Sequence, residues 1–94
     1  MLERDLEKKC CRRVKQAGGE CIKLLTPNGI PDRMILLPHG RIFFVEFKTT
    51  SGRSSRLQEW WQRRLIKLGF VSIITSDENY FEEILREHMT SLGS

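Results

Sequence analysis

Two acidic residues and one lysine stand where they could hold a metal ion next to a phosphodiester. Pro31-Asp32 is followed, after thirteen residues, by Glu46-Phe47-Lys48. Neighbouring buried carboxylates disfavour ionisation unless a cation neutralises them, and oxygen ligands suit Mg²⁺ or Mn²⁺. Such a cation polarises a phosphodiester and lowers the pKa of a bound water, while Lys48 orients the nucleophile or stabilises charge on the phosphorus oxygens. The spacing therefore favours a metal-dependent nuclease centre.

Two predicted strands bring these residues together. The run from Ile42 to Lys48 is rich in β-branched and aromatic residues, and alternation along a strand puts Glu46 and Lys48 on one face. Residues 33–37 form a second apolar run, and the Pro and Gly between the two runs predict a hairpin turn. In an antiparallel hairpin, Asp32 at the start of one strand lies beside Glu46 at the end of the other.

The same residues are compatible with a structural role. Asp32 after Pro31 is a common turn, and Glu46 and Lys48 at a strand end are often solvated. The core pattern has many chance matches, so the remainder of the chain decides between the two interpretations.

The hydrophobic spacing predicts an α/β fold with a mixed β-sheet flanked by helices, in the order αβββαβα. A first helix ends at Gly18-Gly19, and a second helix ends at Gly69. Short strands are predicted at 20–24 and 70–75, and Thr75 to Glu78 resembles a capping box that opens the last helix. The helix between the third and fourth strands implies that these strands are parallel. The apolar stripes of the three helices comprise Leu2, Leu6, Cys10, Val14 and Ala17; Leu57, Trp61, Leu65 and Leu68; and Tyr80, Phe81, Ile84 and Leu85.

The charge is unevenly distributed along the chain. The net charge is +4, yet residues 41–67 hold seven basic and two acidic residues, whereas residues 76–94 hold one basic and five acidic residues. A positive surface beside the site would fit binding to a phosphate backbone, although a solvated helix face would show the same pattern. The predicted DNA-binding residues are Lys23, Arg33, Arg53, Arg56, Arg63 and Arg64, with Lys67 on the same basic segment. Trp60 lies off the apolar stripe of its helix and could stack on a base, contact a partner subunit or simply belong to the core.

Length and composition narrow the class of protein. Residues 1–94 make a single domain, and no apolar run approaches the ~20 residues of a membrane span. The N-terminus lacks a secretory pattern, so we expect a cytoplasmic protein of a bacterial or phage-infected cell. Cys10, Cys11 and Cys21 lack the spacing of a zinc site or a disulfide framework, which favours reduced thiols.

An ordered series of short motifs runs through nearly the whole chain. They are Gly18-Gly19, Lys23-Leu24, Gly29-Ile30-Pro31-Asp32-Arg33, Gly40-Arg41, Val45-Glu46-Phe47-Lys48, Gln58, Trp61 and Gly69-Phe70. From about Leu2 to Leu85 the chain resembles a stand-alone VRR-NUC domain, the virus-type replication-repair nuclease of the PD-(D/E)xK, restriction-endonuclease-like superfamily. The loop Thr26-Pro27-Asn28-Gly29 is shorter than in many relatives, a departure that bears on substrate choice rather than on the site.

The resemblance implies a role for each matching residue. Asp32 and Glu46 would be ligands of Mg²⁺, with Mn²⁺ as a substitute, and the carbonyl of Phe47 would be a further ligand. Lys48 would be the catalytic lysine. Glu7 on the first helix would complete the metal site, through water, and Gln58 matches the glutamine of the helix that follows the catalytic strand.

The resemblance also implies a substrate class. Domains of this size resemble dimeric four-way (Holliday) junction resolvases, so we expect a homodimer acting on branched DNA in replication or repair, without a membrane partner. A symmetric pair of subunits would present the two sites that two similar cuts require. The alternatives are a nuclease that nicks or acts on flaps or forks, and a nucleic-acid-binding module without catalysis.

Overall fold

The computed structural model describes residues 2–25 and 29–90, and the loop discussed above at 26–28 lies outside them. The order of helices and strands is αβββαβα, as the hydrophobic spacing predicts, with a short 3₁₀ turn at Pro38–Gly40. The elements are α1 (Glu3–Gln16), β1 (Glu20–Lys23), β2 (Arg33–Leu37), β3 (Arg41–Phe47), α2 (Arg56–Lys67), β4 (Val71–Thr75) and α3 (Glu78–Thr90).

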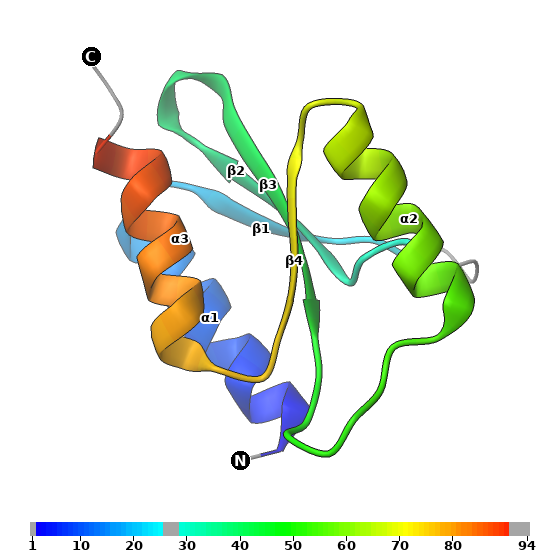
Figure 1. Cartoon of the computed structure of the whole chain (residues 1–94). Helices are drawn as coiled ribbons and strands as arrows, with labels where there is room; N and C mark the ends of the chain where they lie inside the picture. Colours follow the sequence, from blue (N-terminus) through cyan, green and yellow to red (C-terminus); the bar gives the residue numbers. More distant parts are fainter. Residues whose placement is uncertain (1, 26–28, 91–94) are drawn as a thin grey trace.

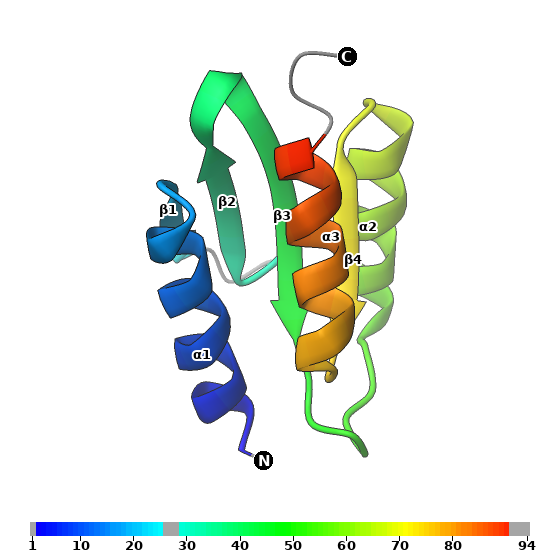
Figure 2. The ribbon, with the colours of Figure 1, turned by 90° about the vertical axis from the view of Figure 1, so that its left-hand side faces the viewer.

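The four strands form one mixed sheet in the order β1-β2-β3-β4. The β1–β2 and β2–β3 pairs are antiparallel. In contrast, β3 and β4 are parallel, because α2 carries the chain back to the edge of the sheet at which β3 begins. The predicted mixed sheet is therefore confirmed. Helices α1 and α3 lie on one side of the sheet and α2 on the other (Figure 1; Figure 2 shows the side that carries α1 and α3).

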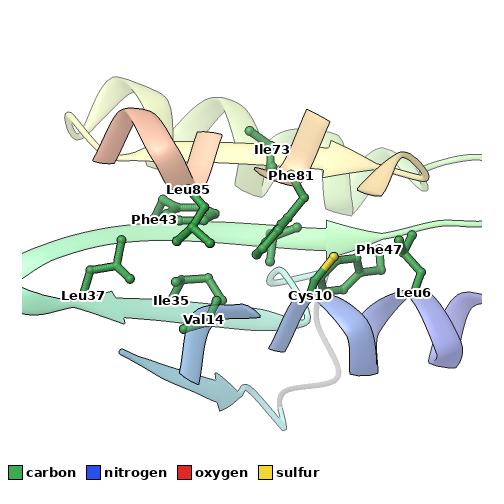
Figure 3. Close-up of a cluster of buried hydrophobic side chains, with 11 residues drawn as sticks. Leu6, Cys10, Val14, Ile35, Leu37, Phe43, Phe47, Ile73, Phe81 and Leu85 are labelled. Atoms are coloured by element: carbon green, nitrogen blue, oxygen red, sulfur yellow. The ribbon is translucent and has the colours of Figure 1, made fainter. Parts of the chain in front are cut away.

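The main core fills the space between the sheet and the α1–α3 pair (Figure 3). Along β3, Phe43, Val45 and Phe47 are fully buried in this core. Because side chains alternate along a strand, Phe44 and Glu46 point to the opposite face, toward α2. The core thus fixes the strand whose other face carries the candidate site. Its buried members are Leu6, Cys10, Val14, Ile35, Leu37, Phe43, Val45, Phe47, Ile73, Phe81 and Leu85.

The helix ends show which local signals the fold uses. Helix α1 stops as predicted, with Gly18 in the left-handed region at φ 87°. The capping box predicted from Thr75 to Glu78 is wrong. Thr75 is the last residue of β4, and the carboxylate of Asp77 instead accepts a hydrogen bond from the Asn79 N–H at 2.8 Å, immediately before α3.

The expectation that all three cysteines are reduced thiols is also wrong. Cys11 on α1 and Cys21 on β1 form a disulfide with their Cα atoms 5.4 Å apart, whereas Cys10 is free and buried. The chain reverses at Gly18, so that β1 runs back beside α1 and brings the two sulfurs together. Among the helices of the described residues, none is long and apolar enough to cross a membrane.

Candidate active site at the ends of the central strands

The register of β2 and β3 places the two predicted carboxylates next to each other. Arg33 pairs with Val45, so the next residues outward, Asp32 and Glu46, stand on opposite strands at the same level. The Asp32 Oδ2 atom accepts a hydrogen bond from the Phe47 N–H at 3.1 Å. The hairpin therefore fixes Asp32 against the end of β3.

Glu46 lies in an environment that is unusual for a carboxylate. Glu46 is only 5% exposed, and its Oε2 atom accepts a hydrogen bond from Gln58 Nε2 at 3.0 Å. The Lys48 Nζ atom is 3.6 Å from the same oxygen. The other oxygen, Oε1, is buried and has no hydrogen-bond partner among the described residues.

The electrostatics of this pair disfavour two negative charges. Burial, followed by the negative charge of Asp32, raises the pKa of Glu46 from 4.5 to about 7, although Lys48 acts in the opposite direction. A cation placed between Asp32 and Glu46 would remove that repulsion. The metal-free protein thus carries an electrostatic cost at neutral pH that a bound cation would relieve.

Helix α2 holds Gln58 in place through its first turn. Ser55 Oγ accepts a hydrogen bond from the Gln58 N–H at 3.1 Å, and Gln58 Oε1 accepts one from the Ser55 N–H at 2.9 Å. This reciprocal capping box leaves the Gln58 amide group free to donate to Glu46. The S-x-x-Q spacing that signals it is present in the sequence, at Ser55 to Gln58, and was missed as a helix start.

Gly29 explains how the loop before Asp32 approaches that turn. Its φ is 77°, and a Cβ atom built on it would lie 2.8 Å from the Leu57 carbonyl carbon and 2.9 Å from the Gln58 backbone nitrogen. Only glycine permits both the left-handed backbone and this close approach. The glycine of the G-x-P-D segment therefore packs directly beneath the helix that positions Gln58.

Lys48 is held just beyond the end of β3. Its N–H donates a hydrogen bond to the Thr75 carbonyl at 2.9 Å, which continues the pairing with β4. Its side chain is largely shielded and points toward Glu46, with 18% of its surface exposed. The lysine is thus directed at the carboxylate pair rather than into solvent.

Glu7 takes part in a neighbouring ion pair. Its Oε2 atom accepts from Arg33 Nε at 2.7 Å, and Arg33 Nη1 also donates to the Cys21 carbonyl at 3.2 Å. Within the described ranges, no group of three or more His, Cys, Asp or Glu side chains is gathered closely enough to hold a metal ion. Asp32 and Glu46 are brought together, whereas Glu7 is engaged with Arg33.

The residues at the strand ends nevertheless fit a magnesium-type ion. Mg²⁺ is commonly bound through one or two carboxylates, retains several waters and takes further oxygens from substrate phosphates. Two adjacent carboxylates, one of them with a buried oxygen that has no hydrogen-bond partner in the described part of the chain, match that requirement. A third protein carboxylate is not needed for this mode of binding.

The predicted DNA-binding residues fall into two groups. Lys23, Arg53, Arg56, Arg63 and Arg64 are exposed, on β1, on the loop before α2 and on α2 itself. Arg33 is instead mostly shielded and already paired. Between α1 and the loop after β3 lies a surface depression of about 510 Å³ that includes Glu7 and Thr49, next to Lys48. Glu7 is the predicted metal-site residue that lines this depression.

Comparison with known proteins adds independent information. The chain matches no protein-family model. Over 79 residues it is 33% identical to the protein named "Putative nuclease p44" from Acyrthosiphon pisum secondary endosymbiont phage 1, an alignment that covers 82% of this chain and 85% of that protein. A solved structure described as a "VRR_NUC domain" superimposes with a TM-score of 0.80 at 25% identity, and the match covers 89% of this chain and 94% of the other.

Proposed function

Because the chain belongs to the VRR-NUC family of nucleases, we propose that it is a metal-dependent endodeoxyribonuclease selective for branched DNA, with four-way junctions as its preferred substrate. The observation that carries the proposal is the Asp32–Glu46 pair, in which Glu46 is buried, has a raised pKa and keeps one oxygen without a hydrogen-bond partner among residues 2–25 and 29–90. A purely structural carboxylate would be expected to satisfy both oxygens.

Asp32 and Glu46 would hold Mg²⁺, or Mn²⁺ in its place, with the Phe47 carbonyl as a further ligand and Glu7 acting through a water. When bound, the ion would supply Lewis-acid polarisation of the phosphodiester and a more acidic water. The oxygen ligands present are those that such hard cations prefer.

Lys48 and Gln58 have distinct tasks in this scheme. The Lys48 ammonium group, 3.6 Å from Glu46, would orient the nucleophile or donate hydrogen bonds to the phosphate oxygens as negative charge develops on them. Gln58 donates to one oxygen of Glu46 and thereby leaves the other oxygen available. Gln58, whose backbone is held by the capping box, would thus position Glu46.

Junction cleavage would require two similarly placed active sites. A homodimer with twofold symmetry presents two such sites, and we propose that the chain acts in this form. Gel filtration with light scattering at micromolar concentration, with and without junction DNA, tests this point. Only monomer under both conditions would contradict it.

The substrate proposal is tested by cleavage of labelled DNAs of matched sequence. A four-way junction, a flap, a fork, a linear duplex and a single strand are each incubated with Mg²⁺, Mn²⁺ or chelator, using wild-type and Lys48→Ala protein. Junction-selective, metal-dependent cuts that disappear in the variant would support the proposal. Cuts confined to flaps or forks would make it a different structure-selective nuclease, and tight binding without any cleavage would favour a non-catalytic binding module.

A further inference from the structure

The outer face of α2 carries a row of basic residues around one tryptophan. At 100° per residue, Arg56, Trp60, Arg63, Arg64 and Lys67 fall within about one third of the helix circumference. Leu65, which is buried against the sheet, lies on the opposite side of the helix. The row is therefore exposed along the whole length of α2, and Figure 1 shows α2 on the side of the sheet away from α1 and α3.

The cations of this row are unpaired in the described part of the chain, although the exposed Glu59 lies three positions after Arg56 and four before Arg63 on the same helix. Among residues 2–25 and 29–90, the side chains of Arg56, Arg63, Arg64 and Lys67 form no hydrogen bond or ion pair. Like charges three or four positions apart destabilise a helix slightly. A surface of this kind is complementary to a polyanion.

Trp60 is part of this surface and does not belong to the core. It is 49% exposed, and its ring stands edge-on to that of Trp61, with centroids 5.1 Å apart and planes at 85°. A depression of about 360 Å³ is lined by Trp60 together with Arg63, Arg64 and Lys67. Trp60 also lines a second depression of about 500 Å³ with Arg56, Leu57 and Trp61.

We propose that this face of α2 binds a single-stranded segment of DNA, with an unpaired base stacked on Trp60 and the neighbouring phosphates on Arg63, Arg64 and Lys67. Stacking on an aromatic side chain requires a base that has left the duplex stack, and basic grooves with exposed aromatics bind single strands in this way. The inference rests on the proposed function, because it names the feature of branched DNA that the nuclease recognises.

The row and the active site lie on different sides of α2. Gln58, in the first turn of the same helix, contacts Glu46, whereas Trp60, two positions later, lies about 160° away around the helix axis. A nucleotide stacked on Trp60 would therefore belong to a strand that passes over the outer face of α2, outside the active site. A twofold contact between two copies through this face is disfavoured because each row of four cations would meet the same row of the partner.

The experiment measures binding in chelator, where no cleavage intervenes, by fluorescence anisotropy of a labelled oligothymidylate and of an abasic strand of equal length. Trp60→Ala should weaken binding of the oligothymidylate between about 5-fold and about 150-fold, the range that base stacking supports, and leave the abasic strand unaffected. Ile66→Ala is the matched control, because Ile66 is 54% exposed on the same helix but lies off the row. It should change neither affinity.

The salt dependence separates stacking from charge. Lys67→Gln should reduce the slope of log affinity against log salt by about 0.7, as expected for one phosphate contact on a single strand. Trp60→Ala should leave that slope unchanged. Equal affinities of wild-type and Trp60→Ala protein for the oligothymidylate would overturn the inference. If Trp60→Ala also converted a dimer into a monomer in light scattering, with that affinity unchanged, the face would be a subunit contact instead.

These outcomes are distinguishable from failure of the proposed function. If the wild-type protein cleaves no DNA with any metal but shows Trp60-dependent binding of single strands, the nuclease proposal fails and the binding surface stands. If it cleaves branched DNA but Trp60→Ala binds normally, only the binding surface fails.

Discussion

Substituting Glu46 by glutamine should stabilise the metal-free protein against unfolding, but only when the pH is above about 4.5. Burial and the adjacent Asp32 raise the pKa of Glu46 from 4.5 to about 7. Below pH 4.5 the group is protonated in both the folded and the unfolded state and contributes no difference. Between pH 4.5 and 7 the folded protein retains a proton that the unfolded chain releases, so that stability falls as the pH rises.

The size of the effect follows from the same pKa change. At about 1.4 kcal/mol per pKa unit, the ionised carboxylate lowers the free energy of unfolding by up to about 3 kcal/mol above pH 7. Glutamine has nearly the same shape, can still accept from Gln58 and carries no charge. Glu46→Gln should therefore match the wild type at pH 4.5 and exceed its stability by up to about 3 kcal/mol at pH 8.

Urea denaturation in chelator at pH 4.5, 6 and 8 measures this difference. Glu83→Gln, the same chemical change at an exposed position of α3, serves as the control and should show no gain that grows with pH. Addition of Mg²⁺ at pH 8 should stabilise the wild type and have little effect on Glu46→Gln. A variant that is no more stable than the wild type at pH 8, or a gain independent of pH, would refute the electrostatic argument.

Three further substitutions test separate parts of the molecule. Lys48→Ala should abolish DNA cleavage but keep the fold, because its ammonium group contacts Glu46 rather than the core, and a large fall in melting temperature would contradict this. Cys11→Ser should lower the free energy of unfolding by roughly 3 kcal/mol in non-reducing denaturation, since the disulfide closes a short loop, and reductant should then affect the wild type but not the variant. Gly29→Ala should lower stability by about 1–3 kcal/mol more than Gly40→Ala, because both glycines have positive φ but only Gly29 lacks space for a Cβ atom. Equal losses in urea denaturation of the two alanine variants would show that the close approach is absent.

Much of the fold follows from patterns that the sequence displays directly. The period of the apolar residues, together with Gly18 and Gly69, is sufficient to predict the order of helices and strands, because each amphipathic segment has one face to bury. The mixed sheet follows from α2, since a helix between two strands of one sheet implies a parallel pair. The observed strand bounds differ from the predicted ones by about one residue, because the pairing of a terminal residue depends on its neighbours in space.

Features that depend on contacts between distant elements were not predictable in the same way. The Cys11–Cys21 disulfide requires α1 to lie against β1, and spacing alone does not reveal that contact. The side chain of Glu7 is held by Arg33, a residue 26 positions away. The two candidate capping boxes, at Ser55 and at Thr75, have the same local pattern, and only the position of Thr75 inside β4 separates them.

The candidate site was predictable only in part from the sequence. The proximity of Asp32 and Glu46 follows from a hairpin that the sequence predicts well, since a short turn fixes the register. The contact between Gln58 and Glu46 depends on where α2 packs, and its capping box could have been found from the spacing of Ser55 and Gln58. The orphaned oxygen of Glu46 is visible only in the folded chain.

The catalytic role of the Asp32–Glu46 pair is best tested by the rate at which wild-type, Asp32→Asn and Asp5→Asn proteins cleave a labelled four-way junction in Mg²⁺. Each variant removes one carboxylate charge, but Asp5 is exposed in the first turn of α1, whereas Asp32 is hydrogen-bonded to the end of β3. We expect metal-dependent cleavage by the wild type and by Asp5→Asn, and its loss in Asp32→Asn. Cleavage by Asp32→Asn at the wild-type rate would show that the Asp32–Glu46 pair is not the catalytic centre.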